Sequence, residues 1–317
     1  RMMVAVRLPD YDPFAAAEDT RRLAQAWAQA LGPWPQRRAP SGLNKRLRIG
    51  VVSADLGVHP VGYFFEALML SEAAQAVDWV VYANAAWDDE VNARLRARAQ
   101  TWHDVSALST DAMCAQVVDD AIDVLLDLSG YTAGSRLDVF ARRPAPVQVA
   151  WLGYFATTGL PGMDAVLADP VCVPEDEAHA FSETVWRLPH TRLCMPPLRQ
   201  APEVAEAPVM QRGHITLGCI QDPQKIGDEV LRAWARIAKA VPNVRIVLQH
   251  SKLGEESATR RAFTERLQAA GISNKQLSFG LGRSFERYLA GFDQFDVLLD
   301  TWPYTGGTTT VQALWMG

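Results

Sequence analysis

The stretch at residues 295–317 reads FDVLLDTWPYTGGTTTVQALWMG and indicates the fold class more clearly than any other segment. Its apolar run, Val297–Leu299, predicts a short buried strand that ends at Asp300. A turn-rich loop with two glycines follows, and three threonines then open an apolar helix. A strand, a loop and a helix in this order are the building block of a Rossmann-like α/β sheet.

The loop of this stretch also predicts a chemistry. Gly306 and Gly307 carry no Cβ and tolerate positive φ, so the backbone could approach a ligand closely. Thr308 and Thr309 place hydroxyls and unpaired N–H groups at a helix N-terminus, where the helix dipole favours an anion. The loop therefore predicts a seat for a diphosphate. An ordinary N-capped helix after a flexible turn is the alternative that local chemistry leaves open.

Strand and helix patterns alternate along most of the chain, in two runs separated by a proline-rich stretch at 189–213. Apolar runs predict strands at 47–53, 79–84, 123–129, 147–153, 165–169, 214–220, 244–250, 276–280 and 296–300. Amphipathic spacing predicts helices between them at 62–75, 88–99, 110–121, 228–241, 255–270 and 284–293. We therefore expect two Rossmann-like α/β domains with parallel sheets, at 46–200 and 201–317, and a ligand cleft between them at the carboxyl ends of strands.

The first 45 residues differ from the rest. Residues 12–31 carry Ala, Leu and Trp at helical spacing and predict an amphipathic helix, and 32–46 is a linker rich in Pro, Arg and Gly. The chain opens at Arg1 and stops at Gly317, one helix after a strand. We therefore expect a fragment of a longer protein whose C-terminal domain is incomplete.

Composition narrows the function classes. Apolar residues make up 49% of the 317 residues and charged residues 21%, as in a protein with a real core, and the net charge is −5. No block of basic residues predicts a nucleic-acid or anionic membrane surface, no apolar run reaches the roughly 20 residues that span a bilayer, and no signal peptide is visible. The 4 cysteines are scattered without metal or redox spacing, which favours a reducing, cytoplasmic compartment.

The loop after the first predicted strand carries two candidate catalytic residues, Asp55 and His59. The carboxyl ends of parallel strands are where open α/β sheets bind ligands. Histidine exchanges protons near neutral pH, and a nearby carboxylate could orient it or relay the proton. The alternative is structural, with Asp55 capping the next helix and His59 hydrogen-bonded to the turn.

Lys225 follows the first strand of the second run, just before a helix. Its ammonium would add to the helix dipole and could face a phosphate, although a solvated surface lysine is the simpler alternative. Lys225 and the threonine-headed helix would leave neighbouring strand ends of one sheet. Two features that each favour an anion, at one edge of the sheet, are more easily explained by a phosphate site than by a surface lysine that happens to lie beside an ordinary capped helix.

Several motifs then resemble a known family. RLRIGVVSADLGVHP, LSGYTAG, FARRPAPVQVAWLGY, MDAVLADP, LPHT, LGCIQDPQKI and the 295–317 stretch occur here in the order seen in O-linked N-acetylglucosamine transferases. The similarity covers about 46–317, and the chain resembles the catalytic region of a bacterial member. That resemblance implies a GT-B glycosyltransferase fold of two facing Rossmann-like domains, a region that follows tetratricopeptide repeats, and a homodimer formed through those repeats. It also implies inverting transfer of N-acetylglucosamine from UDP-GlcNAc to Ser or Thr of an acceptor protein, without metal or other cofactor.

The resemblance also implies roles for particular residues. His59 matches a histidine beside donor and acceptor, Asp55 an aspartate proposed in proton relay, and Lys225 the lysine that stabilises the UDP leaving group. The residues implied in donor binding are Pro60, Leu152, Gly153, Asp222, Gln224, Arg283, Tyr288, Tyr304, Gly307, Thr308, Thr309 and Gln312.

Some positions depart from the animal enzymes of the family. Gly307 stands in place of a histidine, Gln312 in place of an aspartate that holds the ribose, and Tyr288 in place of a histidine at the uracil. Phe285 replaces a lysine and Val61 a threonine beside the sugar, and a second catalytic histidine would lie upstream of Arg1. Plant members use GDP-fucose, so a different donor is one alternative. A scaffold protein with a degraded site, or a GT-B enzyme acting on a glycan or small molecule, are others.

Overall fold

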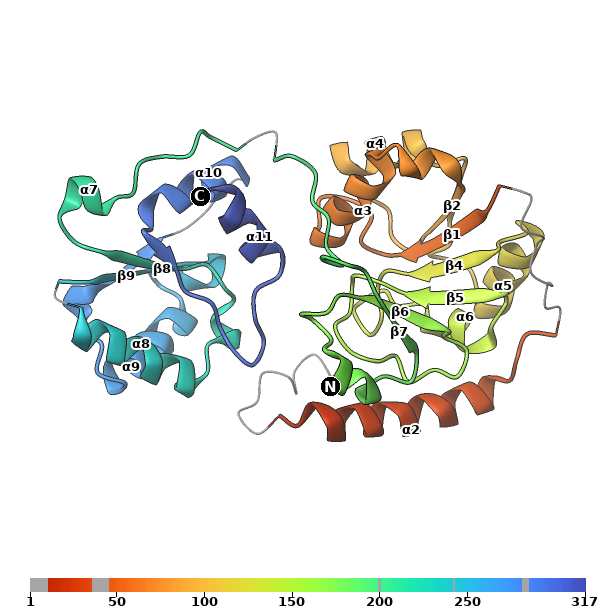
Figure 1. Ribbon diagram of the computed structural model, residues 1–317, viewed down its shortest axis with the longest axis horizontal. Helices are drawn as coiled ribbons and strands as arrows, with labels where there is room; N and C mark the ends of the chain where they lie inside the picture. The colour runs from red at the N-terminus through yellow and green to blue at the C-terminus, as the bar shows by residue number, and fades with distance from the viewer. Residues whose placement is uncertain (1–10, 36–45, 199–200, 242, 281–284) are drawn as a thin grey trace. The chain divides into compact units, whose positions relative to one another are not determined.

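The computed structural model describes residues 11–35, 46–198, 201–241, 243–280 and 285–317 (Figure 1). The chain divides into two compact units. The N-terminal unit comprises Asp12–Pro196, and the C-terminal unit comprises Pro197–Gly317 together with Tyr11. The sequence had placed the boundary four residues later, between 200 and 201.

The N-terminal unit is built on a seven-stranded sheet in the order β3-β2-β1-β4-β5-β6-β7. All neighbouring strands are parallel. The strands are β1 (Arg48–Ser53), β2 (Asp78–Ala83), β3 (Thr101–Asp104), β4 (Val124–Asp127), β5 (Val147–Ala150), β6 (Ala165–Ala168) and β7 (Thr184–Arg187). The predicted parallel sheet is therefore confirmed for this unit.

Helices cover both faces of this sheet, which explains why its central strands are apolar throughout. The helices that follow the strands are α3 (Pro60–Leu70), α4 (Glu90–Arg98), α5 (Thr110–Asp119) and α6 (Leu137–Arg142). Phe65 of α3 meets Trp79 of β2 edge to face, with ring centroids 5.8 Å apart. On the other face, Tyr82 of β2 joins Met113 of α5 and Phe140 of α6 in one buried cluster.

Two strands of this sheet were missed in the sequence. β3 and β7 are its two edges, and both consist of exposed and partly exposed residues rather than an apolar run. A strand paired on one side only needs fewer apolar residues, so TWHD and TVWR carry no strong strand signal.

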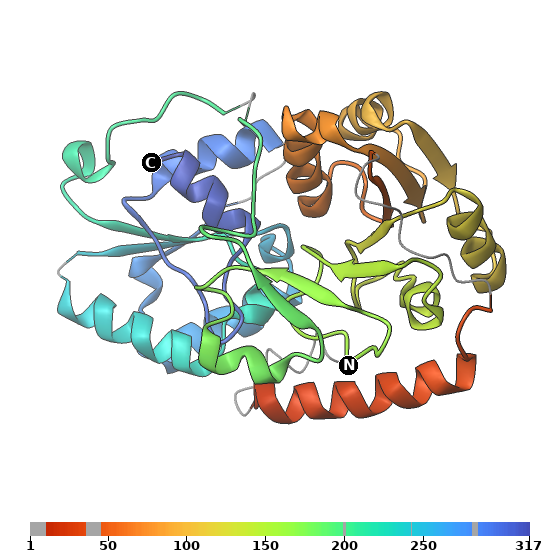
Figure 2. The same cartoon turned by 45° about the vertical axis from the view of Figure 1, so that its right-hand side comes forward.

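The predicted helix at 12–31 is confirmed as α2 (Pro13–Leu31). Asp12 begins it, because its carboxylate accepts hydrogen bonds from the N–H groups of Phe14 and Ala15 at 2.9 and 3.1 Å. Ala24 is 3% exposed and packs into the core of the N-terminal unit. Figure 2 shows α2, in red, running along the outside of that unit.

The C-terminal unit contains a four-stranded parallel sheet in the order β10-β9-β8-β11. Its strands are β8 (Thr216–Cys219), β9 (Arg245–Gln249), β10 (Leu277–Gly280) and β11 (Val297–Leu298). Its helices are α7 (Val209–Arg212), α8 (Asp228–Ala240), α9 (Ala258–Ala269), α10 (Phe285–Ala290) and α11 (Thr308–Trp315). β8 and β11 are direct neighbours, which brings the loops after them together.

Alternate residues of β9 face two separate cores. Ile246 and Leu248 pack with Trp234 of α8, whereas Val247 packs with Met316 at the end of α11. Figure 1 shows α8 and α9 on one side of this sheet and α10 and α11 on the other. The unit is therefore wound on both faces, as a Rossmann-like domain requires.

Within the described ranges, no helix is long and apolar enough to cross a membrane.

Candidate active site

One candidate site lies at the carboxyl edge of the N-terminal sheet, in the loop from β1 to α3. His59 is the residue that begins α3: its Nδ1 accepts a hydrogen bond from the N–H of Val61 at 3.3 Å. Pro60 occupies the first helical position, where its missing N–H costs nothing. The helix is thus capped by His59 and not by Asp55, which corrects one alternative drawn from the sequence.

Asp55 lies beside His59 without a direct hydrogen bond between them. The Oδ1 of Asp55 and the Nδ1 of His59 are 3.9 Å apart, beyond hydrogen-bonding distance. Burial raises the pKa of the Asp55 carboxyl, and the charge of nearby His59 partly offsets this. Because Nδ1 accepts a hydrogen bond, the neutral imidazole carries its proton on Nε2. The side chain of His59 is 38% exposed.

The loop that carries these two residues is held tightly. A Cβ on Gly62 would lie 2.0 Å from the carbonyl oxygen of Gly57, so the start of α3 packs directly on the loop backbone. The indole Nε1 of Trp87 donates to the carbonyl oxygen of Ala54 at 2.7 Å. These contacts fix the chain on both sides of Asp55.

Leu152 and Gly153 follow β5 at the same edge of the sheet. Leu152 has φ +72°, a left-handed conformation that a branched residue adopts only under strain. A Cβ on Gly153 would lie 1.8 Å from the carbonyl oxygen of Leu128, so only glycine fits there. Strain and close packing at the predicted donor-binding pair fit a backbone held in place for a ligand.

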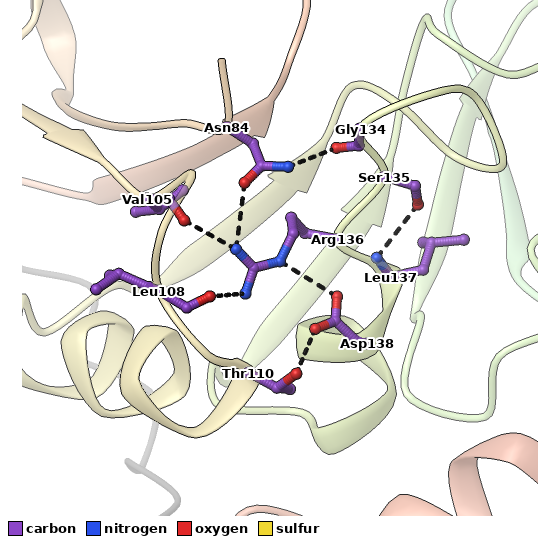
Figure 3. A network of polar contacts seen from close by, with 9 residues as sticks. All are labelled: Asn84, Val105, Leu108, Thr110, Gly134, Ser135, Arg136, Leu137 and Asp138. Carbon is purple, nitrogen blue, oxygen red and sulfur yellow. Dashed lines mark hydrogen bonds and ion pairs between the residues drawn. The ribbon is translucent and has the colours of Figure 1, made fainter. Parts of the chain in front are cut away.

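A buried arginine that the sequence analysis did not single out joins the loops around this edge (Figure 3). Arg136 is 8% exposed and donates to the carbonyl oxygens of Val105 and Leu108 at 3.0 and 3.2 Å. It also donates to the side-chain oxygen of Asn84 at 3.2 Å, and Asn84 donates to the carbonyl oxygen of Gly134 at 3.0 Å. The chain segments after β2, β3 and β4 are therefore tied to one guanidinium.

Asp127 ends β4 and is 1% exposed. Its carboxylate accepts hydrogen bonds from the N–H groups of Ser129 and Gly130 at 3.0 and 2.8 Å. Burial raises the pKa of Asp127 to about 6, although these two hydrogen bonds favour the charged form. The carboxyl holds the turn after β4 through these hydrogen bonds, but its burial makes the ionised form costly, which lowers the stability of the fold when Asp127 is charged.

This pKa predicts a pH dependence of stability. From about pH 4 to about 6 the folded chain keeps a proton that the unfolded chain has lost, so the contribution of Asp127 to the free energy of unfolding falls as the pH rises. The expected loss is about 1.4 kcal/mol for each pKa unit, and it stops above about pH 6. We expect urea unfolding to show the wild type losing stability relative to Asp127→Asn across this window. A difference between the two proteins that does not change with pH would contradict it.

The other candidate site lies at the carboxyl edge of the C-terminal sheet, in the loop after β8. Lys225 ends a short 3-10 helix, η3 (Pro223–Lys225). Its ammonium donates to the side-chain oxygen of Gln221 at 3.2 Å and to the carbonyl oxygen of Thr305 at 3.5 Å. It also lies 4.2 Å from the centroid of the Tyr304 ring. Lys225 is therefore held against the loop after β11, as expected.

The loop after β11 is organised by Asp300. Its Oδ1 accepts hydrogen bonds from the N–H groups of Thr301 and Gly306, both at 2.8 Å. The loop leads into α11, which begins with Thr308 and Thr309 and whose N-cap, Gly307, has no side chain to cap it. The first N–H groups of the helix lack intrahelical partners and can meet an anion.

The two glycines of this loop differ from the expectation. Neither Gly306 nor Gly307 has a positive φ, and the φ of Gly307 is −119°. Gly306 is required for space instead, because a Cβ there would lie 2.2 Å from the side-chain nitrogen of Gln221 and 2.5 Å from the hydroxyl of Thr310. A Cβ on Gly307 would meet no atom within 4 Å, so this position could carry a side chain.

Two further predicted donor-binding residues form a pair. The Tyr288 hydroxyl, on α10, donates to the side-chain oxygen of Gln312, on α11, at 2.9 Å. Gln312 is 4% exposed, and burial raises the pKa of Tyr288. Arg283 lies outside the described residues, and so does the side chain of Phe285.

Asp222 and Gln224 precede Lys225 in the loop after β8. The N–H of Gln224 donates to Asp222 at 3.0 Å, and the ammonium of Lys252, after β9, lies 2.7 Å from the Asp222 carboxylate. Burial raises the pKa of Asp222, but the hydrogen bonds from Lys252 and Gln224 outweigh it and hold the pKa below its usual value. Lys252 therefore offsets the negative charge of Asp222 beside the predicted anion seat.

Gln221 and Lys252 were not predicted as site residues from the sequence. Both stand just after strands of the C-terminal sheet, and that position was the available signal. In the described part of the chain, no group of three or more His, Cys, Asp or Glu side chains is arranged to hold a metal ion.

Comparison with known proteins supplies the class and then the family. The structure is similar to that of a mutant O-GlcNAc transferase of Thermobaculum terrenum, with a TM-score of 0.91, 36% identity, and coverage of 98% of this chain and 59% of that one. The likeness confirms the expected GT-B class. The galactosyltransferase WaaB is similar in fold alone, with a TM-score of 0.52 and 12% identity over 85% of this chain and 78% of that one.

The sequence profile of glycosyl transferase family 41 matches residues 31–196, and the chain belongs to this family. The probable UDP-N-acetylglucosamine–peptide N-acetylglucosaminyltransferase SPINDLY of Arabidopsis thaliana is 34% identical over 90% of this chain and 31% of its own length. The UDP-N-acetylglucosamine–peptide N-acetylglucosaminyltransferase of Caenorhabditis elegans is 37% identical over 46% of this chain and 13% of its own length. The chain thus spans about a third of the length of the Arabidopsis protein, 31% of which is covered.

Proposed function

We propose that the chain transfers N-acetylglucosamine from UDP-GlcNAc to Ser or Thr hydroxyls of an acceptor protein. One observation carries the proposal: in the C-terminal unit, Lys225 and the threonine-headed α11 lie on neighbouring strand ends, joined through Gln221. An ammonium beside a helix N-terminus is suited to a diphosphate. Membership of family 41, and relatives named as peptide N-acetylglucosaminyltransferases, support the sugar and the acceptor.

The proposed reaction is a single displacement. The acceptor oxygen forms a bond to the anomeric carbon while the bond from that carbon to UDP breaks, which inverts the configuration. The bonding electrons leave with UDP, and Lys225 and the N–H groups of α11 stabilise the charge that develops there. Such electrostatic stabilisation is commonly worth a few kcal/mol for each donor, and no metal is invoked.

We propose that a residue of the N-terminal unit accepts the proton that the acceptor hydroxyl loses. With its Nδ1 accepting from Val61, neutral His59 can donate from Nε2 but cannot accept there. Asp55 can accept, and the raised pKa of its carboxyl makes it a stronger base than a solvated aspartate. We therefore assign Asp55 as the base and His59 as a donor that orients the sugar or the acceptor.

Calorimetry with UDP and GDP on the whole chain tests the donor. We expect UDP to bind in the micromolar range and GDP to bind far more weakly. Tight binding of GDP without binding of UDP would replace UDP-GlcNAc by a guanosine donor, and the Tyr288–Gln312 pair would be the first place to seek the reason.

Radiolabelled UDP-GlcNAc tests the chemistry. The expected result is transfer to protein, or slow hydrolysis of the donor when acceptor is absent. Normal affinity for UDP with neither reaction would instead favour a scaffold protein that has kept the nucleotide site.

A further inference from the structure

Gln221 connects the two loops of the candidate diphosphate site. It follows β8 by two residues and is 3% exposed. Its amide contacts three groups from two loops: the Lys225 ammonium at 3.2 Å, the Thr309 hydroxyl at 2.8 Å and the Asp300 carboxylate at 3.4 Å. A buried glutamine with this set of partners is built into the site.

The chemistry of the partners fixes which way the amide points. An ammonium only donates hydrogen bonds, so the group facing Lys225 must be the amide oxygen. A carboxylate only accepts, so the group facing Asp300 must be the amide nitrogen. The same nitrogen donates to the Thr309 oxygen, which leaves the proton of that hydroxyl available to a ligand. Turning the amide over would break the contacts with Lys225 and Asp300 and would reverse the hydrogen bond with Thr309.

Gly306, in the loop after β11, packs directly against this amide. A Cβ on Gly306 would lie 2.2 Å from the Gln221 nitrogen and 2.9 Å from the Thr309 hydroxyl. The N–H of Gly306 is itself bonded to Asp300 at 2.8 Å, so the glycine cannot move aside without losing that bond. The glutamine and the glycine therefore fit as a matched pair.

We propose that Gln221 is the positioning residue of the diphosphate site, setting the ammonium of Lys225 and the hydroxyl of Thr309 at the spacing that a nucleoside diphosphate requires. The inference rests on the proposed function, because it assigns to this site the diphosphate of the donor. Gln221 acts through its two neighbours and needs no contact with the ligand itself. Without it, the ammonium of Lys225 loses the nearer of the two hydrogen-bond acceptors described above, and Thr309 loses the donor that orients its hydroxyl.

A double-mutant cycle on UDP affinity tests this role. Gln221→Met keeps the size and burial of the side chain and removes both hydrogen-bonding groups. We expect it to weaken UDP binding about tenfold, as is typical of a lost hydrogen bond to a charged group. In a Lys225→Met, Thr309→Val background the same change is expected to cost less than about twofold, because the groups that it positions are gone. Calorimetry of the four proteins, with thermal unfolding as a check of the fold, gives the comparison.

A pair of glycine variants provides a second test. Gly306→Ala is expected to weaken UDP binding, because its methyl group would displace the Gln221 amide. Gly254→Ala, in the same unit, is the matched control with unchanged binding, because its methyl group would meet no atom within 4 Å. If Gln221→Met binds UDP as the wild type does, or if its cost is the same in both backgrounds, Gln221 has no positioning role. If the wild type itself does not bind UDP, the proposed function fails, and that result is distinct from either outcome.

Discussion

Lys225→Ala is expected to abolish sugar transfer while the C-terminal unit stays folded. The ammonium of Lys225 is held by polar groups at the end of the sheet, and its side chain is not part of the apolar clusters of this unit. Removing one such donor to a developing negative charge lowers turnover by roughly 10² to 10³-fold in enzymes where it has been measured. The loss is expected mainly in kcat, because the charge on UDP grows as the bond to the sugar breaks.

The control for this change is Lys239→Ala, in the exposed last turn of α8 of the same unit. It removes the same side chain from a position remote in sequence from both strand-end loops. Steady-state rates with UDP-GlcNAc and thermal unfolding of both variants separate a chemical effect from a loss of fold. Turnover of Lys225→Ala near the wild-type rate would remove the lysine from the mechanism and weaken the whole assignment of the site.

His59→Ala is expected to lower turnover by roughly a hundredfold, because it removes the donor that we propose orients the sugar or the acceptor, and misplacing a reactant can cost about that much. The variant also loses the cap of α3, since Nδ1 of His59 accepts from the N–H of Val61. Loss of a cap typically costs about 1 kcal/mol of stability. The alanine variant alone therefore mixes a chemical effect with a structural one.

His59→Asn separates the two effects. Asparagine is a good N-cap residue and can accept from the same N–H, but it has no imidazole. We expect it to unfold at the temperature of the wild type and to be as slow as His59→Ala. An asparagine variant with wild-type turnover would show that His59 only caps the helix, which is the structural alternative that the sequence left open.

The strands of the two sheets show how far the sequence predicts the fold. Runs such as VVYA in β2 were identifiable because a strand covered on both faces must be apolar throughout. The edge strands β3 and β7 were not identifiable, because each pairs with a neighbouring strand on one side only and its residues are exposed or partly exposed. The order of strands was not predictable either, since it depends on crossover connections rather than on any local pattern.

The candidate site divides in the same way. Lys225 and Thr309 were identified from their positions after a strand and at a helix start, and the structure confirms that their loops meet. Their role in binding UDP stays a prediction. The capping by His59 was open in the sequence, because a histidine can cap a helix or act in catalysis from the same position.

The sequence by itself determined the alternation of strands and helices, the family, and the residue types available for the chemistry. The tertiary structure alone decided that β11 lies beside β8, which brings Gln221 to Thr309 across 88 residues of chain. It also decided that Gly306 is needed for space and that Gly307 is not. The physical reason is that periodicity records what each segment buries, whereas contacts between distant loops follow from the order in which the strands pair.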